Sequence, residues 1–158
     1  MINIIIEVSL GSKLKYEYCH KTNMLVLDRV LHNTNTFPYN YGFIPNTLSP
    51  DGDPLDAIVI CNYSLLPGSS INCKVIGGIE TSDEKGIDDK IILVPIDKID
   101  PSSKKINNIK DIDEKILDDI KYFLNHYKDN ENGKYIIVKE TYNKTEAIKR
   151  IKKYTLNN

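Results

Sequence analysis

The chain has 158 residues, of which 41% are hydrophobic and 27% are charged, and its formal net charge is −1. This length suits a single globular domain, residues 1–158, with a core large enough to fold without disulfides or structural metals. A charge so near zero excludes a whole-molecule attraction to nucleic acid or to an anionic membrane, so a charged partner would have to bind at a local cluster.

The first half of the chain is predicted to form strands and turns, because short apolar and β-branched runs alternate with clusters of Gly, Pro, Asn and Asp. The candidate strands are residues 4–8, 13–18, 24–30, 57–63, 71–80 and 90–96. In the run KLKYEY, alternation places Lys15 and Glu17 on the same face, so one strand presents a cation beside a carboxylate. Residues 66–70 are predicted to form a turn, and residues 82–89 an acidic connection between two strands.

Helix is predicted only late in the chain. Residues 112–128 carry apolar side chains at spacings of one, three and four, which is typical of an amphipathic helix. A turn at 129–134 and a last strand at 135–142 follow. Asn143, with Glu146 three residues later, resembles the N-cap of a terminal helix that ends near Tyr154. Many early strands and two late helices indicate an α+β domain, mainly β, built on a small antiparallel barrel or curled sheet.

The three cysteines, Cys19, Cys61 and Cys73, are far apart and have no C-x-x-C spacing, which argues against a disulfide framework or a zinc site. The apolar N-terminal stretch is short, is interrupted by Glu7 and has no basic leader, and no later run approaches membrane-spanning length. We therefore expect a cytoplasmic protein with no membrane partner.

The stretch DGDPLD, from Asp51 to Asp56, places three carboxylates within six residues. Like charges this close raise one another's pKa unless a cation lies among them, so the stretch is either a solvated turn or a metal site. Gly52 permits a sharp turn and Pro54 restricts the backbone, which would hold the carboxylates at a defined separation. An EF-hand does not fit, because the apolar run AIVICN follows where a glutamate ligand is needed.

A second acidic stretch contains Asp83, Glu84 and Asp88 and is followed by Lys90. By itself such a stretch is typical of a solvated charge run. If both acidic stretches lie at adjoining strand ends, however, their carboxylates can face one another across the mouth of a barrel. Ligands with only oxygen donors favour hard cations such as Mg²⁺ or Mn²⁺ over zinc or copper.

Basic and phenolic side chains suggest what such metals would hold. Taken singly, Lys15, Arg29, Lys90 and Lys128 are ordinary surface residues, and Tyr127 fits the apolar stripe of the predicted helix. Combined with carboxylate-bound metals, the same residues would form a phosphate-binding site.

Four segments in order along the chain resemble the soluble family I inorganic pyrophosphatases of the bacterial type. They are FPYNYGFIPNT at 37–47, DGDPLDAIVI at 51–60, SDEKGIDDKI at 82–91 and FLNHYKDNENGKY at 123–135. The resemblance implies an OB-like five-stranded antiparallel β-barrel with two flanking α-helices. It also implies hydrolysis of inorganic pyrophosphate to two phosphates with several Mg²⁺ ions per site, Mn²⁺ being possible, and a homo-oligomer that is a hexamer in many bacterial members.

The resemblance assigns roles to particular side chains. Asp53 would be the general base, and the metal ligands would be Asp51, Asp56, Asp83 and Asp88. The residues that would bind pyrophosphate or phosphate are Lys15, Arg29, Tyr41, Lys90, Tyr127 and Lys128. Supporting contacts, made chiefly through water, would come from Glu7, Glu17 and Glu84.

The sequence departs from the family pattern in a few places. Phe37 stands where many bacterial members carry Tyr, which removes a hydroxyl near the phosphate cavity and is expected to alter its tuning without abolishing activity. The chain also starts later than usual, has one residue fewer between Glu7 and Lys15, and carries GKY in place of the frequent GKW. These changes concern the N-terminal edge and its contacts, not the predicted metal cluster.

Two alternatives from other classes remain open. An OB-like module could hold single-stranded nucleic acid on basic and aromatic side chains, and ten tyrosines permit this. The acidic loops and the interleaved charges argue against it, so nucleic acid is not expected as a partner. A non-catalytic divalent-metal-binding protein is the other alternative, against which the presence of both Asp53 and Lys15 argues.

Overall fold

The computed structural model describes residues 1–157 and contains eight strands, two α-helices and two short 3-10 helices within that range. The strands are β1 (Ile2–Val8), β2 (Leu14–Cys19), β3 (Met24–Val30), β4 (Asn40–Ile44), β5 (Leu55–Val59), β6 (Ser70–Asp83), β7 (Gly86–Pro95) and β8 (Ile136–Asn143). The α-helices are α1 (Glu114–His126) and α2 (Lys144–Tyr154), and the 3-10 helices are η1 (Pro101–Lys105) and η2 (Ile109–Asp111).

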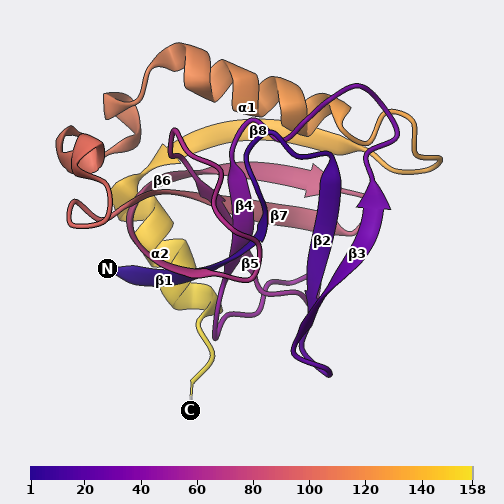
Figure 1. Cartoon of the computed structure of the whole chain (residues 1–158), viewed down its shortest axis with the longest axis horizontal. Coiled ribbons are helices and arrows are strands. Elements are labelled where there is room, and N and C mark those ends of the chain that lie inside the picture. The colour runs from indigo at the N-terminus through magenta and orange to yellow at the C-terminus, as the bar shows by residue number, and fades with distance from the viewer. Residues whose placement is uncertain (158) are drawn as a thin grey trace.

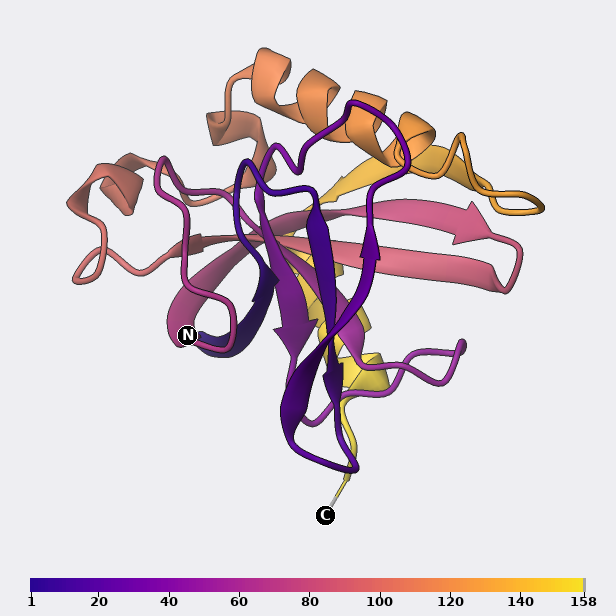
Figure 2. The ribbon, with the colours of Figure 1, turned by 45° about the vertical axis from the view of Figure 1, so that its right-hand side comes forward.

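Five strands close into a barrel, as the resemblance implies. They follow the order β1, β4, β5, β7 and β6, and a further pairing between β6 and β1 completes the ring. Strand β8 pairs with β6 outside the ring, and β2 pairs with β3 as a separate hairpin. Figures 1 and 2 show this hairpin standing beside the barrel and α1 lying over β8.

The predicted OB-like five-stranded barrel is confirmed, but one of its pairings is not antiparallel, because β5 and β7 run parallel. The other four pairings of the ring are antiparallel. Strand direction cannot alternate all the way round a closed ring with an odd number of members, so at least one neighbouring pair must be parallel. The parallel register aligns Asp56 of β5 with Lys90 of β7.

Other predictions differ from the structure in detail. Strand β4 was not predicted, because it is short and includes Asn40 and Gly42, residue types that are rare in strands. Residues 82–89 are not a loop, because β6 extends to Asp83 and β7 begins at Gly86. Asp88 therefore lies on a strand, where the ladder holds its backbone.

Both α-helices begin and pack as their sequences suggest. Asp113 caps α1 by accepting a hydrogen bond from the backbone N–H of Lys115, and Asn143 caps α2 in the same way from Glu146. The apolar stripe of α1 packs into one cluster of buried side chains, and that of α2 packs into a second cluster on the other face of the barrel strands. Among residues 1–157, neither helix has the length and apolar character needed to span a membrane.

Alternation along β7 places Asp88 and Lys90 on the same face of the strand as the apolar side chains that pack against α1. Ile92 and Val94 belong to the cluster that packs against this helix. Because side chains two residues apart share a face, Lys90 and Asp88 continue the same row toward the end of the barrel. The barrel thus delivers an acidic and a basic side chain to one place from a single strand.

Gly42 of β4 is where backbone packing leaves least room. A Cβ atom at this position would lie 1.9 Å from the carbonyl oxygen of Ile5 on β1. We expect Gly42→Ala to lower the free energy of unfolding by about 3 kcal/mol, the upper range for overpacking, because backbone must move. Urea unfolding would measure the loss. Ile137→Val, at a half-exposed position on β8, is the control and should change stability by less than about 0.5 kcal/mol. An equally small effect of Gly42→Ala would contradict this prediction.

Candidate active site

The principal cavity lies between the barrel mouth and the β2–β3 hairpin and has a volume of about 240 Å³. That volume is below the roughly 300–1,000 Å³ of pockets for drug-sized ligands, so the cavity suits a small ligand. All fourteen residues to which the resemblance assigns a role line it. They come from β1 to β7 and from the end of α1, which explains why no single stretch of sequence reveals the cavity.

Lys90 is the centre of the acidic side of the cavity. Its Nζ atom lies 2.8 Å from Oδ2 of Asp56 and 2.9 Å from Oδ2 of Asp88, and it donates a longer hydrogen bond, 3.3 Å, to the hydroxyl of Tyr41. Only 2% of Lys90 is exposed. A buried ammonium group is stable only when paired, and these carboxylates hold the pKa of Lys90 well above its ordinary range despite its burial.

The pKa values of the two partners of Lys90, Asp56 and Asp88, are shifted in opposite directions. Burial raises the pKa of Asp56 to about 6, and the attraction of Lys90 only partly offsets it. At Asp88 burial also raises the pKa, but the ion pair with Lys90 outweighs it and the net shift is downward. The site therefore keeps one carboxylate ionised well below neutral pH and another that protonates in mildly acidic solution.

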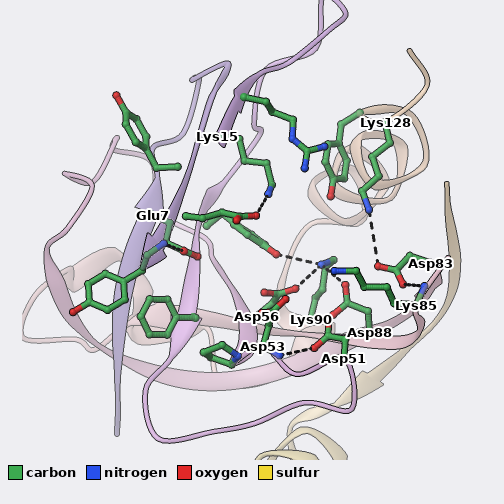
Figure 3. A pocket seen from close by; sticks show the side chains of 18 of the residues that line it. Glu7, Lys15, Asp51, Asp53, Asp56, Asp83, Lys85, Asp88, Lys90 and Lys128 are labelled. Atoms are coloured by element: carbon green, nitrogen blue, oxygen red, sulfur yellow. Dashed lines mark hydrogen bonds and ion pairs between the residues drawn. The ribbon is translucent and has the colours of Figure 1, made fainter. Parts of the chain in front are cut away.

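The remaining acidic residues surround this pair. Asp51 accepts a hydrogen bond of 3.0 Å from the backbone N–H of Asp53, and Asp83 accepts one of 2.8 Å from the backbone N–H of Lys85. These bonds hold each carboxylate across its own turn. Burial, together with repulsion from neighbouring aspartates, raises the pKa of Asp51. Figure 3 shows these carboxylates gathered on one side of the cavity.

The charges of the lining indicate that a cation is needed. Eight carboxylates line the cavity, against six lysine and arginine side chains. No three acidic, histidine or cysteine side chains within residues 1–157 are arranged as a ready-made metal cluster, since the ammonium group of Lys90 lies between Asp56 and Asp88. Even so, the oxygen-only donor set and the uncompensated repulsion at Asp51 fit a hard divalent cation.

The opposite side of the cavity carries cations. Lys15 Nζ lies 2.8 Å from Oε1 of Glu17, its neighbour on the same face of β2, as alternation predicted. Lys128, just after α1, has its Nζ atom 3.9 Å from carboxylate oxygens of both Asp83 and Glu84. Figure 3 shows Lys15 and Lys128 facing the carboxylates across the cavity. Opposed acidic and basic walls are an arrangement suited to a phosphate compound bound together with metal ions.

Aromatic rings form the floor behind these cations. Tyr127 stacks on Phe123 of α1 with ring centroids 5.0 Å apart, and Phe37 lies 4.7 Å from Phe123 and 5.8 Å from Tyr41. Phe37 is 2% exposed, and it is not one of the described residues that line the principal cavity. Its ring fills the core directly behind Tyr41, so the missing hydroxyl affects the layer behind the cavity wall.

Sequence reasoning missed five titratable residues that line the cavity: Tyr16, Tyr18, His20, Lys85 and Lys134. His20 packs edge-on against Phe43 at a centroid distance of 5.5 Å. Lys134 lies within the resemblance segment at 123–135, where its cationic side chain could have been noticed. Lys85 likewise lies within the resemblance segment at 82–91, whereas no periodic or motif signal marks His20.

A closed five-stranded barrel with carboxylates and cations facing one another at its mouth is suited to a class of protein, the hydrolases of phosphoanhydrides. The family model described as inorganic pyrophosphatase matches residues 4–157. The chain therefore belongs to the inorganic pyrophosphatase family, and it is an inorganic diphosphatase, which hydrolyses pyrophosphate.

Individual relatives agree with this assignment. The chain is 47% identical to the inorganic pyrophosphatase of Saccharolobus solfataricus, over 96% of this chain and 88% of that protein. It is 50% identical to the inorganic pyrophosphatase of Nanoarchaeum equitans, over 93% and 91% of the two chains. Its structure resembles that of the Helicobacter pylori inorganic pyrophosphatase with a TM-score of 0.94 at 42% identity, covering 96% of this chain and 89% of the other.

Glu7 gives the metal-free protein a distinctive dependence of stability on pH. Burial raises its pKa from the ordinary value of 4.5 to about 7, although the backbone N–H of Tyr18 donates a hydrogen bond to it and opposes the shift. The folded state thus binds this proton more tightly than the unfolded state. The stabilisation is present below pH 4.5 and is lost as the pH rises through about 7.

We expect Glu7→Gln to remove this contribution, which is on the order of 3 kcal/mol at most. Urea unfolding in EDTA at pH 5 and at pH 8 would then show a smaller fall in stability for Glu7→Gln than for the unmodified chain. Glu140→Gln, at an exposed position on β8, is the matched control. Between pH 5 and pH 8 its free energy of unfolding should fall by as much as that of the unmodified chain. Parallel pH profiles for the Glu7 variant and the unmodified chain would show that Glu7 is not the titrating group.

Proposed function

We propose that this chain hydrolyses pyrophosphate with the help of several Mg²⁺ ions, by attack of a water molecule from which Asp53 accepts a proton. The observation that carries this proposal is the cavity itself, in which excess carboxylates face cations across a space sized for a small anion. Without added positive charge, the acidic wall would repel the substrate.

The metal ligands are proposed to be Asp51, Asp56, Asp83 and Asp88. Their carboxylates supply the oxygen donors that Mg²⁺ prefers, and Mn²⁺ would be accepted by the same set. When bound, such ions lower the pKa of water and screen the charge of the substrate. Glu7, Glu17 and Glu84 are proposed to support the ions through water, in keeping with the reluctance of Mg²⁺ to lose its hydration shell.

Asp53 suits the role of general base because it takes part in no ion pair found within residues 1–157. Its backbone is held to Asp51, while its side chain remains exposed at the cavity. In the proposed step the water oxygen bonds to one phosphorus as a proton passes to Asp53. The bridging P–O bond breaks, and the second phosphate leaves with the electron pair.

The cationic wall is proposed to bind the two phosphates. Arg29 can grip a phosphate through two parallel hydrogen bonds, whereas Lys15 and Lys128 act as point charges. Tyr41 and Tyr127 would donate hydrogen bonds to the phosphates through their hydroxyl groups. Burial raises the pKa of both hydroxyls, which keeps them protonated. Lys90 would hold Asp56 and Asp88 in position and face the substrate from the acidic wall.

Residues 1–158 are proposed to form a single pyrophosphatase domain that acts in the cytoplasm, with no nucleic-acid or membrane partner. A homo-oligomer, a hexamer by family resemblance, is proposed as its assembled form. Exposed apolar side chains on the outer hairpin support this proposal, since scattered exposure is ordinary but clustered exposure favours an interface. They are Leu14, Met24, Val26, Leu27 and Val30.

Metal dependence can be tested by activity and by stability together. Mg²⁺ added to EDTA-treated protein is expected to restore phosphate release from pyrophosphate. It should also raise the thermal unfolding temperature, because a ligand that binds only the folded state stabilises it. Potassium chloride at equal ionic strength is the control and should do neither. Equal turnover in EDTA and in Mg²⁺ would rule out the proposed requirement.

Asp53→Asn tests the assignment of the base. The amide cannot accept the proton, so turnover is expected to fall by about 10²- to 10⁴-fold. The rise in unfolding temperature caused by Mg²⁺ should persist, since Asp53 is not a proposed metal ligand. Asp97→Asn, which alters an exposed aspartate paired with Lys74 away from the cavity, is the matched control. Normal turnover by Asp53→Asn would mean that another group accepts the proton.

A further inference from the structure

Glu131 is a buried carboxylate to which neither the sequence nor the resemblance assigned a role. It lies in the segment between α1 and β8, and only 6% of its side chain is exposed. It is not among the described residues that line the principal cavity, although Arg29 and Lys134 are. Any influence of Glu131 on the reaction must therefore pass through its neighbours.

Those neighbours are two of the cations of the cavity. Oε1 of Glu131 accepts a hydrogen bond from Nη1 of Arg29 and lies 3.6 Å from Nζ of Lys134. Arg29 is 102 positions away in the sequence, on the outer hairpin. The pair thus connects the strand that carries Arg29 to the segment that follows α1.

Arg29 is held from two sides. Its Nε atom lies 2.8 Å from Oδ2 of Asp28, the preceding residue. Because Asp28 belongs to the same strand, it moves with Arg29 and cannot fix the guanidinium relative to the rest of the cavity. Asp28 is also shared with Lys15, whose Nζ lies 3.6 Å away. Glu131 is the partner that ties Arg29 to the side of the cavity formed by the end of α1.

The second oxygen of Glu131, Oε2, is buried and has no hydrogen-bond partner within residues 1–157. A buried polar atom without a partner is costly to the folded state. An apolar residue at this position would avoid that cost, so packing alone does not account for a carboxylate here. A negative charge directed at Arg29 and Lys134 does account for it.

We propose that Glu131 is a positioning residue that orients the guanidinium of Arg29 toward the bound phosphate. It does so without touching the substrate. This inference rests on the proposed role of Arg29 in phosphate binding and extends it to a residue outside the cavity.

The test is a double-mutant cycle with Arg29→Ala, Glu131→Gln and the combined variant, each assayed for pyrophosphate hydrolysis in saturating Mg²⁺. Glu131→Gln keeps the shape of the side chain but removes its charge. We expect it to raise KM by about tenfold, the value of one charge-assisted hydrogen bond, with a smaller change in kcat. Inhibition by added inorganic phosphate should weaken by a similar factor. In the Arg29→Ala background, Glu131→Gln should change KM by less than about twofold.

The matched control is Asp129→Asn, in the same segment. Asp129 is exposed, and its carboxylate lies 2.8 Å from Nδ1 of His126, so its loss should leave KM unchanged. Thermal unfolding of each variant reports whether it is folded. If Glu131→Gln does not fold, Glu131→Asp keeps the charge but withdraws it by one methylene, and it should show the same rise in KM.

The outcomes separate this inference from the proposal on which it rests. An unchanged KM for Arg29→Ala would show that the role proposed for Arg29 is wrong. A rise for Arg29→Ala with none for the Glu131 variants would overturn the positioning role alone. Equal effects of Glu131→Gln with and without Arg29 would also overturn it, because Glu131 would then act independently of the guanidinium.

Discussion

The ion pairs of Lys90 are the interaction on which the acidic side of the cavity depends. An ammonium group that is 2% exposed needs its two carboxylates, and the carboxylates, buried and close together, need the ammonium. The geometry comes from the parallel register of β5 and β7, which sets Asp56 beside Lys90. A closed ring of five strands must contain a parallel pair, and here that pair is the one that carries Asp56 and Lys90, so the electrostatics of the site are tied to the topology of the barrel.

Much of the acidic cavity wall could be predicted because local rules govern it. DGDPLD concentrates carboxylates at a turn, alternation places Lys15 beside Glu17 on β2, and the motif order pointed to the family to which the chain belongs. The helices were also predictable, since apolar spacing and caps are local signals. The resemblance added the expectation that residues far apart in the sequence form one site. The structure places all fourteen residues to which it assigned a role around one cavity.

The remaining features depend on contacts that local patterns do not encode. Strand β4 has little strand propensity of its own and is stabilised by pairing with β1 and β5. The acidic stretch at 82–89 resembles a loop in composition, but its backbone pairs along β6 and β7. Glu131 lies in a polar turn sequence that suggests exposure, and only its tertiary contact with Arg29, 102 positions away, reveals a buried ion pair.

The β2–β3 hairpin lies outside the closed ring, yet it carries Lys15 and Arg29. The two walls of the cavity consequently differ in how cooperatively they unfold. The backbone amides of β5 and β7, which carry Asp56 and Asp88, are expected to exchange only when the ring opens, whereas a two-stranded ribbon can detach at much lower free energy. Local opening of the hairpin would then withdraw Lys15 and Arg29 from the cationic wall, while the acidic wall and Lys128 keep their places.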